Sequence, residues 1–382
     1  MTYSVYQHWD PLKVCIVGRS YAPEFYHFIK NDRVRTVMER IARETEEDYQ
    51  KLIKLLESFG VEVLRPLIHD DYKHYLTADN KIAPPPMTPC DYSVMIGNTF
   101  YHNWLNLLTT YDSIKADHWP AIETLEDFEE LDDYIKQEVY EEVRNATTAV
   151  YHDYKHIIDR ISGTGNTVLS SPFRGPEFCK PLSRAHITRV GKDLYIGTDE
   201  SDDVNTAKKV SELFTENRTH IIRTGGHCDA VFCPVVPGLI ISLNDVQIYA
   251  DTFPGWEVVY LPNQSWEMVR PFLDLKEKNQ GKWWVPGEEL NDDFTDFVES
   301  WLGHWVGYVE ETVFDVNMLV IDRHNVVCNN YNKEVFEAFE RHGVTPHIIN
   351  FRHRYFWDGG LHCITSDVHR ESTMEDYFPE RG

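Results

Sequence analysis

The sequence predicts an α/β protein built from repeated ββαβ units. Two observations support this class: short apolar strand–turn–strand patterns recur along the chain, and a helical pattern with another strand follows several of them. A third is that no Pro/Gly/Ser-rich linker is long enough to separate domains. We therefore expect one domain, residues 1–382, with its units arranged around an axis; a multi-domain α/β protein is the alternative.

The first predicted unit lies near the N-terminus. Residues Lys13–Gly18 read as a strand that ends at a glycine, and a long helix is expected from about Arg33 to Phe59. Gly60 ends this helix, and Val61–Leu64 is the next predicted strand.

Later parts of the chain repeat the same pattern. Turn residues such as Gly-Asn and Pro-Gly stand between two apolar strands in each case. The expected strand pairs lie at 93–101, 187–196, 231–242 and 318–328, the helices at 205–217 and 333–342, and the closing strands at 220–222 and 344–349. An acidic insertion at about 121–164 breaks the pattern and is itself predicted to be helical.

Composition restricts the class of function. The formal net charge of -25 repels phosphate backbones, so nucleic-acid binding is not expected. Small cations would be attracted, but we favour the simpler interpretation that the charge keeps the protein soluble. We see no signal peptide and no apolar run near the roughly 20 residues needed to cross a membrane. The seven cysteines are scattered and odd in number, which indicates a reducing compartment and predicts a cytoplasmic protein.

Two glycine-rich segments carry the candidate chemistry. Gly359–Cys363 places a histidine and a cysteine after paired glycines, and Gly225–Asp229 places His227 two residues before Asp229. A thiolate nucleophile with a nearby imidazole is the minimum requirement for cysteine nucleophilic catalysis. If His227 and Asp229 lie on a strand, both side chains face one pocket, where the carboxylate can hold a cation.

Each of these residues also has a structural interpretation. Cys363 could be a packed core thiol, His227 a histidine bonded to a carboxylate, and Asp91 a turn residue before a strand. A metal site is the rival chemistry, with soft ligands available from Cys228, His227, His362, Cys363 and His369. The expected ligand spacings CxxC and HxxxH are absent, so we expect no metal.

With these residues identified, the chain resembles the amidinotransferase family of the guanidino-modifying superfamily. The opening His8–Arg19, the later block Glu310–Asn317 and above all Gly359–Asp367 are similar to family motifs. The resemblance implies a five-bladed α/β propeller of ββαβ modules with pseudo-fivefold symmetry, a fold that agrees with the repeats.

The resemblance also implies roles for particular residues. Cys363 would be the nucleophile and His227 the acid/base, while Asp91 and Asp229 would hold a guanidinium by bidentate hydrogen bonds. The implied reaction is ping-pong transfer through an amidino-cysteine, with a small-molecule guanidine donor, an amine acceptor and no cofactor. A homodimer is the default expectation for such an enzyme.

The sequence departs from the family pattern in three places. Ser183 stands where the family has an aspartate, followed by two small residues, that orients the histidine; Glu177 or another acid would have to substitute. Val246 falls near the place of an arginine that holds the donor's carboxylate, and Tyr101–Tyr111 lacks arginines expected there. These changes bear on the identity of donor and acceptor.

The sequence thus predicts an amidinotransferase that acts on arginine or a related guanidine, with a primary amine such as glycine as acceptor. A guanidine-modifying hydrolase needs the same cysteine, histidine and carboxylates, so it remains an alternative. A non-catalytic guanidine-binding protein is the third hypothesis, because Ser183 replaces the expected carboxylate.

Overall fold

Five small sheets form the framework of the protein. The computed structural model describes residues 1–76, 81–102, 153–170, 183–198, 203–224, 227–243, 249–261, 284–302 and 315–382. Within these ranges every sheet has three strands, with an antiparallel pair followed by a third strand parallel to the middle one. The mixed α/β class is therefore confirmed, and each sheet shows the strand pattern of the predicted units.

The strands of each sheet lie in the same relative order. The sheets are β15 (Thr365–Arg370), β1 (Leu12–Val17) and β2 (Glu62–Leu64); β3 (Ser93–Ile96), β4 (Thr99–His102) and β5 (Thr167–Ser170); β6 (Ile187–Val190), β7 (Asp193–Thr198) and β8 (Arg218–Arg223); β9 (Phe232–Val236), β10 (Leu239–Leu243) and β11 (Glu257–Leu261); β12 (Leu319–Asp322), β13 (Asn325–Cys328) and β14 (Thr345–Ile348).

Helical segments connect the second and third strands of the sheets. These are α1 (Asp32–Ser58), a helical stretch at 153–163, α6 (Asp203–Leu213), α7 (Tyr249–Thr252) and α10 (Lys333–His342). The other helices are α2 (Pro89–Tyr92), α9 (Asp292–Trp301), α11 (Arg354–Trp357) and the 3-10 turns η1 (Pro23–Phe28), η2 (Tyr72–Tyr75) and η3 (Pro379–Arg381). Most of the predicted insertion, residues 121–152, lies outside the described residues.

The helix ends and hairpin turns follow from local sequence. The Asn31 side chain accepts hydrogen bonds from the first free backbone N–H groups of α1, and Asn332 does the same for α10. Gly343 ends α10 with a φ of 69°, a conformation that glycine adopts at little cost. Gly97 and Gly191 likewise turn the chain at positive φ between β3 and β4 and between β6 and β7.

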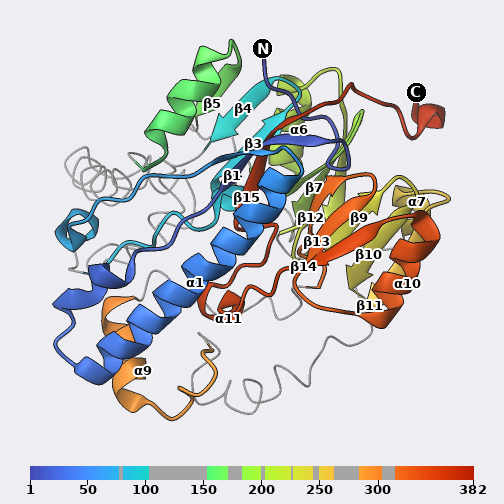
Figure 1. The fold of residues 1–382 in the computed structure, drawn as a ribbon. Helices are drawn as coiled ribbons and strands as arrows, with labels where there is room; N and C mark the ends of the chain where they lie inside the picture. The colour runs from blue at the N-terminus through green and yellow to red at the C-terminus, as the bar shows by residue number, and fades with distance from the viewer. Residues whose placement is uncertain are drawn as a thin grey trace.

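The two ends of the chain join in one sheet. β15, near the C-terminus, pairs antiparallel with β1, near the N-terminus, so that Ser366 lies opposite Ile16. Figure 1 shows these strands beside each other, with the long helix α1 running across the molecule toward α9. The buried apolar face of α1, including Met38, Ile41 and Leu52, packs into the largest hydrophobic cluster. This pairing fixes the segment before β15 against the rest of the fold.

No helix in the part of the chain that the structure describes is long and apolar enough to cross a membrane. The single-domain organisation, the arrangement of the sheets around an axis and the cytoplasmic location stay predictions.

Candidate active site

The predicted site residues all lie in short segments that precede the first strand of a sheet. That strand is an edge strand of its sheet in each case. Asp91 precedes β3, Ser183 precedes β6, His227 and Asp229 precede β9, and Cys363 precedes β15. The fifth sheet follows the same rule, because Asn317 precedes β12. The repeated unit therefore places one polar segment per sheet at an equivalent position.

The segment that carries Cys363 turns sharply before β15. Asp358 has a φ of 49°, an uncommon conformation for a residue other than glycine. A Cβ atom on Gly360 would lie 2.5 Å from Oδ1 of Asn317, so no larger residue fits there without movement. Cys363 itself is buried, with 2% of its surface exposed. Gly360 thus allows Asn317 to approach the cysteine segment.

Asn317 fixes this segment with both ends of its side-chain amide. Its Oδ1 accepts hydrogen bonds from the backbone N–H of His362 at 2.7 Å and of Cys363 at 3.2 Å. Its Nδ2 donates to Sγ of Cys363 at 3.0 Å and contacts Oδ2 of Asp229 at 3.3 Å. The amide therefore holds the thiol and the carboxylate in a common geometry, and its donor favours a negatively charged sulfur.

The carboxylate of Asp229 uses its two oxygens very differently. Oδ2 lies 2.7 Å from Nδ1 of His362, 3.5 Å from Sγ of Cys363 and 3.6 Å from Sγ of Cys90. Oδ1 is buried and accepts no hydrogen bond from the described residues. A buried carboxylate oxygen without a donor is uncommon in folded proteins, and it marks a place for a ligand's N–H group.

Burial and neighbouring charges set the protonation states of Asp229 and His362. Burial lowers the pKa of His362 to about 4, and the positive charge of Arg184 acts in the same direction. Burial alone would raise the pKa of Asp229, but His362, His227 and Arg184 together lower it below the usual range. Asp229 is therefore ionised at neutral pH and accepts a hydrogen bond from the neutral imidazole of His362.

His227 and Ser183 meet through a residue that the sequence analysis did not identify. Oγ of Ser183 lies 2.8 Å from Nδ1 of His186, and the His186 ring packs edge-to-face against the His227 ring with centroids 4.6 Å apart. His227 and Asp229 lie in a turn before β9 and not on a strand, so the strand argument for their common direction was wrong. The charge of His227 nevertheless acts on Asp229.

Asp91 lies next to Cys90, and Cys90 contacts the Cys363 segment directly. Both residues belong to α2, and the backbone N–H of Cys90 donates to the carbonyl of Cys363 at 3.3 Å. The thiol of Cys90 lies 3.3 Å from Nδ1 of His362. The structure therefore brings the Asp91 segment, the Asp229 segment and the Cys363 segment together.

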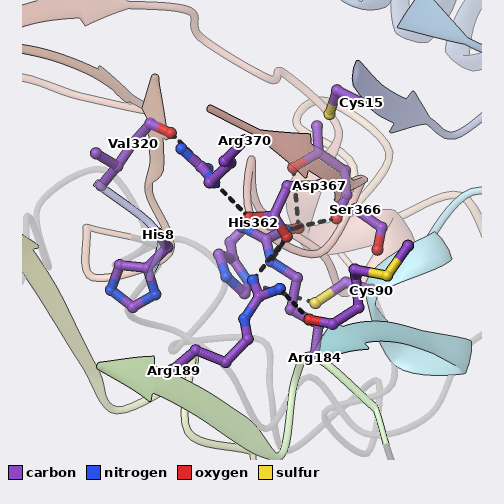
Figure 2. Close-up of polar contacts among 12 residues, drawn as sticks. His8, Cys15, Cys90, Arg184, Arg189, Val320, His362, Ser366, Asp367 and Arg370 are labelled. Atoms are coloured by element: carbon purple, nitrogen blue, oxygen red, sulfur yellow. Dashed lines mark hydrogen bonds and ion pairs between the residues drawn. The ribbon is translucent and has the colours of Figure 1, made fainter. Parts of the chain in front are cut away.

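A second buried polar cluster, centred on Asp367, lies next to the site and is connected to it through Arg184. Asp367 is fully buried and forms ion pairs with Arg184 at 3.0 Å, Arg189 at 2.6 Å and Arg370 at 2.5 Å. Burial opposes ionisation, but the three guanidinium groups hold the pKa of Asp367 well below its usual value. Figure 2 shows these arginines around Asp367, with His362 beside them at the centre of the view and Cys90 to the right.

Arg184 links the two clusters. Its Nη1 donates to the carbonyl of Thr365 at 2.9 Å and reaches the carbonyl of His362 at 3.5 Å. It also lines a small cavity together with His8, Arg189 and His362. Arg184, directly after Ser183, therefore places a buried positive charge beside the site.

Sequence reasoning missed Asn317, Cys90, Arg184 and His186 as site residues. Asn317 lies at the end of a recognised motif, which was the one available signal. The other three contact the site only because segments from different sheets meet. Glu177, Val246 and residues 103–111, which the sequence analysis singled out, lie outside the described residues.

Comparisons with known proteins agree with the predicted resemblance. No family model matches the chain. Mitochondrial glycine amidinotransferase of Xenopus tropicalis is 22% identical over 397 residues, covering 98% of this chain and 84% of the relative. Putative inosamine-phosphate amidinotransferase 2 of Streptomyces griseus is 22% identical over 411 residues, covering 98% of both.

The fold is similar to that of solved amidinotransferase structures. The solved structure of SxtG, an amidinotransferase of the saxitoxin biosynthetic pathway from Microseira wollei, matches with a TM-score of 0.62 at 16% identity, covering 99% of this chain and 100% of that one. The similarity to amidinotransferases is thus confirmed in sequence and in fold.

Proposed function

We propose, proceeding from this similarity to amidinotransferases, that the protein transfers an amidino group from arginine or a related guanidine to a primary amine such as glycine. One observation carries the proposal. Sγ of Cys363 lies 3.5 Å from a buried carboxylate, that of Asp229, whose other oxygen accepts no hydrogen bond from the described residues. A nucleophile beside such a carboxylate suits a planar cation whose central carbon is to be attacked.

The guanidinium would be held between two carboxylates. Oδ1 of Asp229 accepts one N–H group of the donor, and Asp91, next to Cys90, accepts from another side. Ionisation of Asp229 at neutral pH supports this role, because a carboxylate accepts charge-assisted hydrogen bonds. Asn317 keeps the sulfur at a fixed distance from Asp229 while the donor enters.

The proposed reaction has two balanced halves. The thiolate of Cys363 attacks the central guanidinium carbon, and the carbon–nitrogen bond to the leaving amine breaks as His227 gives that nitrogen a proton. An amidino-cysteine remains. His227 then takes a proton from the acceptor amine, which attacks the same carbon, and the carbon–sulfur bond breaks to restore the thiolate.

His186 lies beside His227 and takes the place of the carboxylate that orients the histidine in the resembled family. Ser183 fixes Nδ1 of His186, and the His186 ring packs against that of His227. This arrangement orients the ring of His227 without stabilising its charged form as an aspartate would. Orientation by His186 together with Ser183 is therefore part of the proposal.

The remaining parts of the proposal concern assembly. The same position of the site segments in all five sheets supports a five-bladed α/β propeller with the site at its axis. A homodimer and a cytoplasmic location are proposed as expected for the enzyme class. No metal or organic cofactor takes part in the proposed reaction.

Product analysis tests the proposed function. Purified protein is incubated with arginine, with and without glycine, ornithine or lysine, and the products are separated and identified by mass. Ornithine together with a new guanidino compound, formed only when an acceptor other than ornithine is present, is the expected result. Citrulline or urea formed without any amine would indicate the hydrolase instead, and tight arginine binding without any product would indicate the binding protein.

A further inference from the structure

We propose that Cys90, Asp229, His362 and Cys363 form a binding site for a thiophilic divalent cation of the Zn²⁺ class. Ligand atoms of Cys90, Asp229 and His362 all lie within 4.8 Å of one another. The fourth group, Sγ of Cys363, lies 3.5 Å from the same Oδ2 of Asp229 that contacts the other two. Two thiols, an imidazole and a carboxylate are ligands that Zn²⁺ prefers in proteins.

The distances among Cys90, Asp229 and His362 agree with one tetrahedral ion. With metal–sulfur bonds of about 2.3 Å and metal–nitrogen or metal–oxygen bonds of about 2.0 Å, ligand atoms of a tetrahedral site lie roughly 3.3–3.8 Å apart. Sγ of Cys90 is 3.3 Å from Nδ1 of His362 and 3.6 Å from Oδ2 of Asp229. Nδ1 of His362 and Oδ2 of Asp229, 2.7 Å apart, must separate, because the ion replaces the hydrogen bond between them. Sγ of Cys363 is not in the group whose ligand atoms lie within 4.8 Å of one another, so it must move toward Cys90 and His362 to complete the tetrahedron.

The surrounding protein would hold the ligands in place. Asn317 binds the backbone of His362 and Cys363, and the backbone N–H of Cys90 donates to the carbonyl of Cys363. Such outer contacts orient metal ligands and raise affinity. The charge also balances: two thiolates and one carboxylate exceed a divalent ion by one negative charge, and the buried guanidinium of Arg184 lies beside the site.

Binding of the ion would release a defined number of protons from the ligands. Both thiols lose their protons to solvent, while the proton on Nδ1 of His362 is replaced by one on Nε2, so two protons are released per ion. The site differs from the rival set of the sequence analysis: the thiol of Cys228 instead donates to the carbonyl of His186, and His369 pairs with the backbone of Ser4.

The consequence for activity rests on the proposed function. Cys363 is the proposed nucleophile, so an ion bound to its sulfur would block amidino transfer reversibly. Cys90 has no step in that reaction and is the residue that turns the active site into a metal site. A chelator would restore activity.

Titration of the purified protein, residues 1–382, with Co²⁺ tests the site without any need for turnover. The wild type is expected to bind one Co²⁺ ion, and binding is expected to produce the charge-transfer absorption band of a thiolate–cobalt bond. Cys90→Ala should lose at least about 100-fold in affinity, more than the loss of an outer-shell partner costs. Cys15→Ala is the matched control, since it removes another buried free thiol, on β1, and should bind like the wild type.

Two further measurements keep the outcomes distinct. Cys90→Ser preserves the volume of the side chain, and thermal unfolding establishes that each variant is folded. Absence of thiolate absorption in the wild type, or equal affinity of Cys90→Ala and Cys15→Ala, would overturn the proposal. A failed amidinotransferase assay would leave the cobalt result intact, so the two proposals fail separately.

Discussion

Two buried carboxylates, Asp229 and Asp367, lie in neighbouring clusters and have opposite surroundings. Both oxygens of Asp367 are paired with arginine guanidinium groups, and the residue is fully buried. Asp229 is contacted by a neutral imidazole, an amide and two thiols on one oxygen, while its other oxygen accepts no hydrogen bond from the described residues. A fully paired charge stabilises one conformation, whereas a partly paired one is available for a ligand.

The largest expected effect concerns the nucleophile beside Asp229. Cys363→Ala should lower kcat by roughly a thousand-fold or more, because the covalent step loses its nucleophile. The fold should persist, since Asn317 still accepts from the backbone at position 363. Steady-state kinetics with arginine and an amine measures this, with Cys15→Ala as the matched control. Activity retained in Cys363→Ala would contradict the covalent mechanism.

Exchange of each carboxylate for its amide separates the two clusters. Asp367→Asn should cost about 3–5 kcal/mol of unfolding free energy, because it leaves buried arginines without their counter-charge. Asp229→Asn should cost far less stability, yet it should weaken donor binding and turnover by on the order of 100-fold. Urea unfolding and kinetics on both variants measure the contrast. Equal losses of stability would refute the division into a structural and a functional cluster.

The amide between thiol and carboxylate gives an intermediate effect. Asn317→Ala removes the donor to Cys363 and the acceptor of two backbone groups, so kcat should fall roughly 10–100-fold. Asn166→Ala is the matched control, because Asn166 is also buried and bonds the backbone of Tyr3 and Asn98, away from the site. It should lower stability and leave kcat of the folded fraction unchanged. An unchanged kcat in Asn317→Ala together with a lowered kcat in Asn166→Ala would show that Asn317 has no role in the active site.

A third buried carboxylate sharpens the comparison through pH. Asp153 has a tyrosine hydroxyl donor at 3.0 Å, from Tyr75, and burial raises its pKa to about 7. Because the folded pKa exceeds the unfolded one, the contribution of Asp153 to stability is full below about pH 4 and is lost as pH rises through 7.

Asp153→Asn should therefore stabilise the protein by on the order of 1–3 kcal/mol at pH 8, with little difference from the wild type near pH 4. Urea unfolding at the two pH values measures this. A difference between wild type and variant that does not grow with pH would mean that Asp153 is ionised throughout, as Asp367 is.

Much of the fold could be predicted from the sequence, because its signals are local. Gly97 and Gly191 turn hairpins at positive φ, and Gly60 and Gly343 follow helices that begin and end close to the predicted residues. These features depend only on neighbouring residues and on the spacing of apolar side chains.

The site could be predicted only in part. Cys363 was found because its glycines are needed locally, one of them for the close approach of Asn317. Cys90 and Arg184 carry no local signal, since the hydrogen bonds that their side chains make in the site are to residues more than 130 positions away in the chain. His186 was hidden for a related reason: the expected aspartate at Ser183 directed attention to acids, whereas a second imidazole occupies the place beside His227.

Trapping of the covalent intermediate tests the central claim most directly. Wild-type protein is mixed with arginine in the absence of an acceptor amine, quenched with acid, digested and analysed by mass spectrometry. The account predicts the mass of one added amidino group on the peptide that contains Cys363, lost again when a productive amine is supplied before the quench. Protein that turns over arginine with no adduct on Cys363, or with the adduct on Cys90, would contradict it.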